Sequence, residues 1–236
     1  MRVLTFASQK GGSGKTTLAG HIAVQAEAMG AGPVALIDTD PQGSLADWWH
    51  ERESETPVFA HTSVSELASD LRELADMGMK LVVIDTPPAI TSMIEKVIEV
   101  SELVVIPTRP SPHDLRAAGA TVQLVEALNK SMMFVVNAAS RRARITSEAA
   151  IALSQHGIVA PVTIHQRTDF AASMIDGRTV MELDPKARSS KEIAQLWDYM
   201  NAKLNKVHRT IISPDRFTIP RRKRTQVPGV EQTETA

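Results

Sequence analysis

The stretch SQKGGSGKTT, residues 8–17, decides the fold of this chain. It follows a β-rich run at residues 2–7 and leads into a helical pattern, which is the strand–loop–helix order of a P-loop. Glycines in such a loop let backbone N–H groups approach phosphate oxygens, and the following helix presents its positive N-terminal end. Position 9 is Gln where the standard motif has Gly, so the match is to the variant KGGSGKTT. The stretch predicts a phosphate-binding site.

The predicted nucleotide-binding residues of this loop are Lys10, Gly11, Gly12, Ser13, Gly14, Lys15, Thr16 and Thr17. Lys15 is expected to contact the β- and γ-phosphates of ATP, and the Thr16 hydroxyl to ligate Mg²⁺. The alternative is a glycine-rich turn that binds nothing. Because glycine makes up only about 7% of residues in proteins, a chance match to this spacing of glycines and lysines is rare. The loop therefore predicts binding of Mg·ATP.

Short apolar runs alternate with helical patterns along the chain. Residues 82–84 and 104–106 are continuous apolar runs, as expected for strands that are covered on both faces. The alternation predicts an α/β fold, with a mostly parallel, twisted sheet covered by helices on both faces and ligands at the carboxyl ends of the strands. The expected strands are residues 2–7, 33–38, 80–85, 103–107, 132–137 and 159–165.

Two helices are predicted from capping boxes, in which a serine and a glutamate three residues later bond each other's backbone N–H groups. One box pairs Ser63 with Glu66, and the other pairs Ser189 with Glu192 at the start of a helix over residues 189–207. We expect the apolar stripe of the second helix to pack on the sheet rather than on a membrane surface. The stripe comprises Ile193, Leu196, Trp197, Met200, Leu204 and Val207.

The composition excludes several kinds of site. The 236 residues include no cysteine, which rules out disulfides, thiolate zinc sites and cysteine-held iron–sulfur clusters. No run of about eighteen apolar residues occurs, and the N-terminal apolar stretch is too short for a signal peptide. We expect a cytoplasmic protein with one domain over residues 1–210 and a basic, flexible tail over residues 211–236.

The net charge of −1 conceals an uneven distribution. Residues 203–224 contain eight lysines and arginines and one acid, a formal charge of +7, whereas the rest of the chain carries −8. Such segregation is typical of a basic arm that binds a polyanion. A solvated helix end followed by a solvated tail would explain the same composition, so the charge alone leaves both interpretations open.

Two acids close β-rich runs downstream of the loop. Asp40 lies in LIDTDPQ, residues 36–42, and Asp85 lies in VVIDTPP, residues 82–88. A carboxylate at a strand end can reach the shell of a bound Mg²⁺, as a Walker B acid does. Each acid could instead cap the helix that follows. In a chain that also has a P-loop, we interpret both acids as functional.

At these residues the chain resembles the ParA/MinD family of deviant Walker-A ATPases, specifically its small ParA-type partition proteins. The likeness extends over most of residues 1–200 and rests on blocks in a fixed order. These are KGGSGKTT, DTDPQGS followed by Asp47-Trp48, VIDTPP, IPT leading to Asp114-Leu115, and HQR at 165–167 leading to Gly177. Among relatives, nitrogenase-like reductases need cluster cysteines, and membrane-cycling MinD proteins end in an amphipathic helix that residues 217–224 do not match.

The resemblance implies roles for individual residues. Lys10 would reach across an ATP-bound homodimer to the nucleotide of the partner subunit. Asp40 matches the acid that helps to position the attacking water, and Asp85 matches the Walker B acid. The catalytic set is then Lys10, Lys15 and Asp40, and the metal set is Thr16 and Asp85. Asn137 matches a position that contacts adenine, although a strand-end asparagine can also simply form a turn.

The resemblance also implies binding of non-specific DNA through basic residues in the C-terminal region, where Arg167, Lys186 and Arg188 lie. Arg141, Arg142 and Arg144 form another cluster. Contacts of this kind are made to phosphates, so they should be independent of sequence and sensitive to salt. Arg167 could serve the nucleotide or the dimer interface instead.

The leading hypothesis is an ATPase associated with the nucleoid that positions a plasmid, a chromosome or a protein assembly. Hydrolysis would be slow until a ParB-like or other adaptor stimulates it, and no membrane partner is expected. One alternative is a biosynthetic or metallochaperone-type P-loop ATPase that does not act on DNA. Another is a nucleotide-binding scaffold without turnover. Binding of non-specific DNA with ATP, with ADP and without nucleotide separates the first two hypotheses.

Overall fold

One parallel sheet organises the residues that the computed structural model describes, which are 1–88, 92–141 and 143–212. Its seven strands lie in the order β3-β2-β4-β1-β5-β6-β7, and each strand pair is parallel. β1 therefore lies at the centre, between β4 and β5. The strands are β1 Arg2–Phe6, β2 Val34–Asp38, β3 Val58–Phe59, β4 Leu81–Asp85, β5 Leu103–Thr108, β6 Ser131–Val136 and β7 Ile158–Val159.

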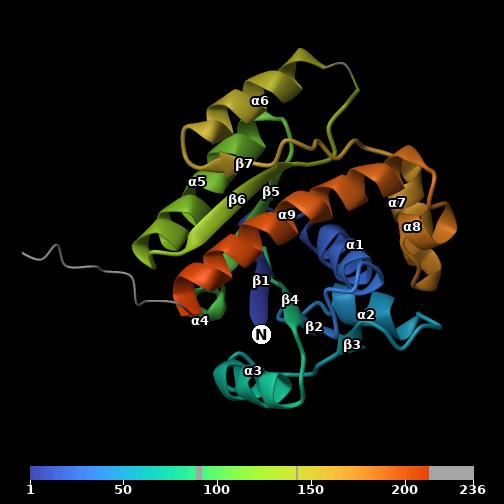
Figure 1. The fold of residues 1–236 in the computed structure, drawn as a ribbon. Helices are drawn as coiled ribbons and strands as arrows, with labels where there is room; N and C mark the ends of the chain where they lie inside the picture. The colour runs from blue at the N-terminus through green and yellow to red at the C-terminus, as the bar shows by residue number, and fades with distance from the viewer. Residues whose placement is uncertain (89–91, 142, 213–236) are drawn as a thin grey trace, which may run out of the picture.

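Helices cover both faces of this sheet (Figure 1). Leu4 and Phe6 pack with α1, α2, α8 and α9 on one face, and Val3 packs with α3 and α4 on the other, where α5 and α6 also lie. The predicted α/β fold is confirmed. The helices are α1 Lys15–Ala28, α2 Ser44–His50, α3 Leu67–Asp76, α4 Ser92–Val100, α5 Pro112–Ala127, α6 Arg144–Ser154, α7 Thr168–Ser173, the 3₁₀ turn η1 Met174–Asp176, α8 Val180–Leu183 and α9 Arg188–Ile212.

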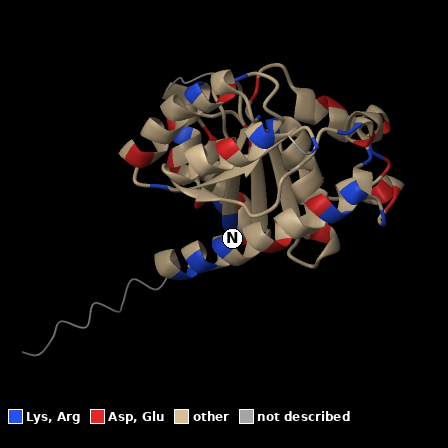
Figure 2. Ribbon diagram, turned by 90° about the horizontal axis from the view of Figure 1, so that it is seen from above, with Lys and Arg blue, Asp and Glu red and all other residues tan. Residues whose placement is uncertain are grey.

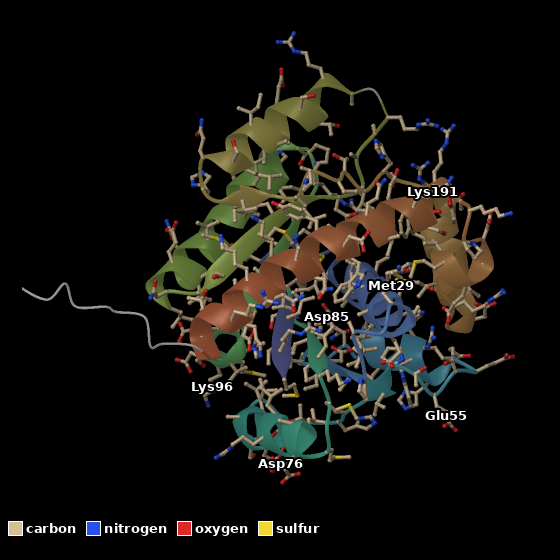
Figure 3. The ribbon with its side chains drawn as sticks, viewed as in Figure 1. Met29, Glu55, Asp76, Asp85, Lys96 and Lys191 are labelled. Atoms are coloured by element: carbon tan, nitrogen blue, oxygen red, sulfur yellow. The ribbon has the colours of Figure 1, made fainter. Side chains whose placement is uncertain are left out.

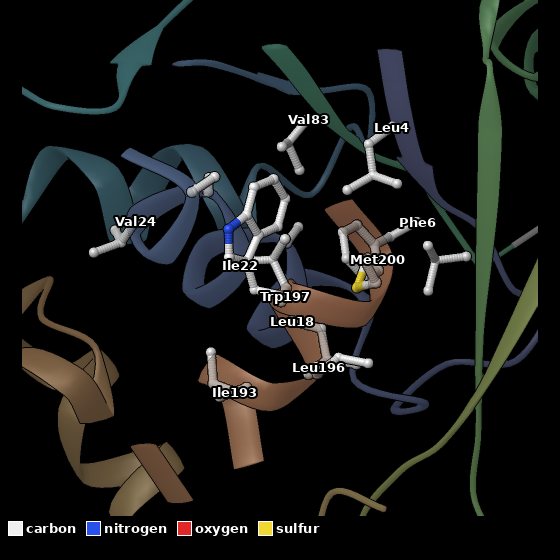
Figure 4. Packing of buried hydrophobic residues seen from close by; sticks show 14 of the residues in the cluster. Leu4, Phe6, Leu18, Ile22, Val24, Val83, Ile193, Leu196, Trp197 and Met200 are labelled. Carbon is white, nitrogen blue, oxygen red and sulfur yellow. The ribbon is translucent and has the colours of Figure 1, made fainter. Parts of the chain in front are cut away.

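The long helix α9 packs through the apolar stripe that its sequence predicts. Trp197 is 1% exposed, and Leu196 and Met200 are fully buried. Figure 4 shows these side chains together with Leu18 and Ile22 of α1. Each leucine or isoleucine buried in this way stabilises the fold by about 1.5–3 kcal/mol. The stripe thus fixes α9 against α1, the helix that follows the phosphate loop.

The sheet differs from the prediction at its two edges. The strand expected at residues 159–165 is limited to Ile158–Val159, and single backbone hydrogen bonds to β6, such as that from Ile164 N–H to the Val136 oxygen at 3.0 Å, and an isolated bridge between Ala139 and His165 continue the pairing. Pro161 lies in this segment and has no backbone N–H to donate, so a continuous ladder cannot form. At the other edge, β3 pairs with β2 over two residues and is too short to be visible as a pattern in the sequence.

One predicted capping box forms a turn, and the other is wrong. The Ser63 hydroxyl accepts the backbone N–H of Glu66 at 3.3 Å, but α3 begins only after Glu66. Ser189 lies inside the first turn of α9 and donates its hydroxyl to Asp169 at 2.5 Å. Glu192 accepts the backbone N–H of His165 at 3.1 Å. Partners that are distant in the sequence therefore replace the local bonds that the pattern predicts.

The chain from residue 1 to the end of α9 belongs to the same packed unit, because α9 contacts both α1 and β1. Within the ranges that the structure describes, no helix is both long enough and apolar enough to cross a membrane. Residues 211–212 are the end of α9, and the remainder of the predicted tail lies outside the described residues.

Candidate nucleotide-binding site

The phosphate loop joins the end of β1 to the start of α1 at the centre of the sheet. Gly12 and Gly14 have φ angles of 72° and 94°, a region that favours glycine. At Gly14 a side chain is also excluded by space, because an added Cβ would lie 2.1 Å from the amide nitrogen of Asn137. Gly14 is followed directly by α1, so the loop ends at a helix N-terminus, as the sequence predicts.

Lys15 is held inside the loop. Its side chain is part of the buried set, and its Nζ lies 3.4 Å from the backbone oxygen of Lys10. Burial lowers the pKa of Lys15, while the nearby charges of Asp85 and Asp40 partly oppose this. A buried cation at the N-terminus of α1 is well placed to receive phosphate oxygens.

Thr16 and Asp85 meet beneath the loop. The Thr16 hydroxyl donates to the Asp85 carboxylate at 2.5 Å, and Asp85 is 1% exposed. Figure 3 shows Asp85 in the interior of the molecule, at the end of β4, whereas Lys191 lies at its periphery. Burial raises the pKa of Asp85 to about 7, and the hydrogen bond from Thr16 acts in the opposite direction. A hydroxyl and a carboxylate are oxygen ligands of the kind that Mg²⁺ prefers, so this pair fits a magnesium site.

The loop after β2 places Asp40 opposite the phosphate loop. Asp40 and Lys15 line the same hollow, which has a volume of about 650 Å³. Asp38 holds this loop in shape, because its carboxylate accepts the backbone N–H groups of Asp40 at 2.9 Å, Leu45 at 2.9 Å and Ala46 at 3.1 Å. Sequence reasoning missed Asp38, although the repeated acid in DTD was an available signal. Asp38 therefore fixes the backbone at Asp40, and the Asp40 carboxylate itself accepts the backbone N–H of Gln42 at 3.0 Å.

Lys10 lies apart from this hollow. Its Nζ donates to the Asp114 carboxylate at 2.8 Å, and its side chain is 39% exposed while that of Asp114 is 6% exposed. Burial would raise the pKa of Asp114, but hydrogen bonds from Lys10 and Ser111 outweigh it and lower this pKa. Lys10 is thus held by its own subunit at the edge of the site. The sequence blocks included Asp114 but did not predict this ion pair.

Asn137 supports the loop directly. Its buried side-chain amide donates to the backbone oxygen of Ser13 at 2.7 Å. It also borders a side hollow of about 200 Å³ beside Gly14, which is lined by Gln166, Phe170 and Met174 among others. The predicted adenine contact by Asn137 stays a prediction, and the structure adds a second role as a brace of the phosphate loop.

Basic residues gather at the start of α9. A hollow of about 450 Å³, the basic hollow, is lined by Arg141, His165, Arg167, Arg188, Lys191 and Glu192. Arg167 is paired with Glu192, whereas Arg188 and Lys186 are exposed. Arg144 lies one helix away and pairs with Glu148, and Arg142 lies outside the described residues. Figure 2 shows further Lys and Arg segments near the other end of α9.

Comparison with known proteins agrees with this geometry. Residues 4–180 match the model of the CobQ/CobB/MinD/ParA nucleotide binding domain. The chain is 28% identical over 214 residues to the maintenance of carboxysome distribution protein A of Halothiobacillus neapolitanus, covering 86% of this chain and 95% of that protein.

Two solved structures share the fold. The MinC:MinD cell division complex of Aquifex aeolicus superposes with a TM-score of 0.72 at 18% identity, covering 86% of this chain and 96% of that chain. A putative plasmid partition protein of Borrelia burgdorferi bound to AMPPNP superposes with a TM-score of 0.67 at 19% identity, covering 86% and 99%. With the P-loop, its glycines and the Thr16–Asp85 pair in place, the chain belongs to the ParA/MinD family of nucleotide-binding proteins.

Proposed function

We propose that this protein is an ATP-dependent dimerising switch that binds non-specific DNA and positions or partitions a cargo. The observation that carries the proposal is the different placement of two lysines of one loop. Lys15 lies inside the phosphate hollow, whereas Lys10 is held on Asp114 at the edge. Because Lys10 does not line the hollow of its own subunit, it would serve a second subunit once it leaves Asp114. Family membership supports ATPase activity, and the dimer and the DNA contact are the parts that we add.

In the proposed cycle each residue performs one task at a stated atom. Lys15 Nζ would neutralise the β- and γ-phosphates, and the Thr16 and Asp85 oxygens would hold Mg²⁺, which neutralises phosphate charge when bound. The Asp40 carboxylate would orient the attacking water. Lys10 Nζ would leave Asp114 and contact the phosphates held by the partner subunit. Because phosphoryl transfer depends mainly on positioning and charge, this site would turn over slowly until an adaptor completes it.

The proposed cargo follows from the names of relatives. One relative is named for the maintenance of carboxysome distribution, and one structural neighbour for plasmid partition. Both names describe positioning of a large object in the cell. A plasmid, a chromosome or a protein assembly is therefore the class of cargo we propose, with localisation on the nucleoid and a ParB-like or other adaptor as the stimulating partner.

The basic residues at the start of α9 support the DNA contact. Lys186 and Arg188 are exposed beside the basic hollow, so they are accessible to phosphates. Two subunits joined by ATP would present this surface twice, and affinity for a polyanion rises steeply with the number of phosphate contacts. Arg167, the third predicted DNA contact, is paired with Glu192, so it would have to leave this partner to bind a DNA phosphate. The competing proposal, a biosynthetic ATPase, predicts no nucleotide-dependent DNA binding.

The test is a salt titration of affinity for non-specific duplex DNA with ATP, with ADP and without nucleotide. We expect binding that requires ATP and that Lys186→Ala/Arg188→Ala largely removes, with each lost phosphate contact lowering the log–log salt slope by about 0.9. Deletion of residues 213–236 should leave weaker binding that still requires ATP. The matched control is Arg72→Ala/Lys96→Ala, which removes one exposed arginine and one exposed lysine from α3 and α4 on the opposite face of the sheet.

Two results would contradict this assignment. If Lys186→Ala/Arg188→Ala still binds DNA and deletion of residues 213–236 abolishes binding, the DNA contact belongs to residues 213–236 instead. Equal binding with ATP, with ADP and without nucleotide would contradict the switch itself.

A further inference from the structure

Arg109 lies at the junction between the phosphate loop and the side hollow. It follows directly after β5, whose carboxyl end is at the same edge of the sheet as the loop. One of its terminal nitrogens, Nη2, is 3.9 Å from where a Cβ on Gly12 would be. Arg109 also lines the side hollow together with Gly14, Thr17 and Asn137. A single arginine therefore reaches the loop and borders the hollow beside it.

Three cations of the loop and the side hollow already have a partner or a buried position. Lys10 is paired with Asp114, Arg167 is paired with Glu192, and Lys15 is buried in the loop. Arg109 is exposed, and among residues 1–88, 92–141 and 143–212 no carboxylate lies within 4.0 Å of its guanidinium. Asp114 is near enough to interact with this charge but forms no ion pair with it, so the planar donors of Arg109 are available for a phosphate.

The surroundings decide which phosphates Arg109 can reach. The side hollow has apolar walls from Phe170 and Met174 and amides from Asn137 and Gln166, which suits a flat heterocycle with polar edges. Gly14 and Thr17 line both this hollow and the hollow that Lys15 lines, so a nucleotide with its base in the first and its terminal phosphates over Lys15 would pass its inner phosphates beside them. Arg109 borders this path.

We propose that Arg109 is a nucleotide-binding residue whose guanidinium contacts the α- and β-phosphates of the nucleotide bound in its own subunit. This inference rests on the proposed ATP-driven cycle and adds to it a residue that acts equally in two states. Because ADP and ATP share these phosphates, Arg109 would hold the nucleotide before and after hydrolysis. Lys10, in contrast, would act only while the γ-phosphate is present.

The test is calorimetric binding of ADP and of ATP to Arg109→Ala, Arg109→Lys and the control Arg116→Ala. Arg116 is an exposed arginine on α5, seven residues along the chain. We expect Arg109→Ala to lower the affinity for ADP and the affinity for ATP by the same factor, about tenfold or more, because a charge-assisted contact is lost. Arg109→Lys should recover part of the affinity, because lysine keeps the positive charge but lacks the planar, bidentate donors of the guanidinium. Arg116→Ala should bind like the wild type.

Thermal melting of each variant shows whether the fold is kept. The inference would be overturned if folded Arg109→Ala bound ADP within twofold of the wild-type affinity. It would also be overturned if only the affinity for ATP fell, because the contact would then be to the γ-phosphate. A loss of equal size in Arg116→Ala would also overturn it, since general electrostatics would explain both. Failure of the wild type to bind either nucleotide would overturn the proposed function together with this inference, whereas the other outcomes leave that function standing.

Discussion

Two regions of the molecule are proposed to bind phosphate groups, and they hold their cations differently. In the phosphate loop, Lys15 is buried among backbone groups that Asn137 braces. In the basic hollow, Arg188 and Lys191 are exposed and have no such support. A buried lysine meets one anion in one geometry, so its loss removes the site. Exposed cations each neutralise one phosphate of a polyanion, so removing them one at a time lowers the affinity for the polyanion by successive increments.

The largest expected effect belongs to the loop. Lys15→Ala should weaken ATP binding by about 100-fold or more. Hydrogen bonds to charged groups contribute about 1.5–3 kcal/mol each, and Lys15 is proposed to contact two phosphates. The measurement is calorimetry at low salt, with Lys96→Ala of α4 as a control of equal charge. If Lys15→Ala binds ATP as tightly as the wild type, the loss of this one buried lysine does not remove the site, and the loop does not differ from the basic hollow in the way described.

The support beneath the loop should make stability depend on pH. His21 of α1 is fully buried, its Nδ1 donates to the backbone oxygen of Thr17 at 2.7 Å, and its Nε2 accepts the backbone N–H of Val180 at 3.2 Å. Burial lowers the pKa of His21 to about 4. The unfolded chain, with a histidine pKa of about 6.5, therefore binds more protons than the folded protein between these values.

His21 thus contributes stability that is fully present above pH about 6.5 and is lost as the pH falls toward about 4, on the order of 3 kcal/mol in total. Other groups titrate in the same range, so the measurement is a difference. Urea unfolding should give a free energy of unfolding that falls more for the wild type than for His21→Gln as the pH is lowered from about 6.5 to about 4. A difference that does not vary with pH would mean that His21 is not held neutral by its burial.

A smaller effect tests how closely Asn137 and the loop are fitted. Gly14→Ala should destabilise the protein by about 1–2 kcal/mol from backbone strain alone, and by more because its Cβ would collide with the Asn137 amide. In a Gly14→Ala/Asn137→Ala protein the collision is absent, so the double variant should be less unstable than the sum of the two single losses. Strict additivity in thermal unfolding would argue against the packing described here.

The sequence predicted the loop well because its spacing leaves little freedom. Lys15, Thr16 and Asp85 lie where the motif and the strand ends place them, since parallel strands bring their carboxyl ends to one edge. The prediction failed where partners are distant in the chain. Glu192 binds His165 rather than the start of its own helix, and no local pattern records that choice.

The same limit applies in part to the two acids that position other residues. Asp38 orients the loop of Asp40, for which the repeated acid in DTD was a signal, whereas the role of Asp114 in holding Lys10 follows only from a three-dimensional contact. For the basic hollow, the sequence located Arg167 and Arg188, but exposed arginines of this kind occur on most proteins. Residues fixed by the loop motif and by strand ends were thus easier to predict than residues whose roles depend on contacts with distant parts of the chain.

Lys10 is proposed to serve the partner subunit, and this role can be tested by mixing two inactive variants. Lys10→Ala and Asp40→Ala should each lose turnover. In a mixed dimer the Asp40→Ala subunit provides an intact Lys10 to the nucleotide held by the Lys10→Ala subunit, whose own Asp40 is intact. We predict that mixing restores ATP hydrolysis at one of the two sites. Absence of recovery, with mixed dimers demonstrated by differential labelling, would show that Lys10 does not act on the partner's nucleotide.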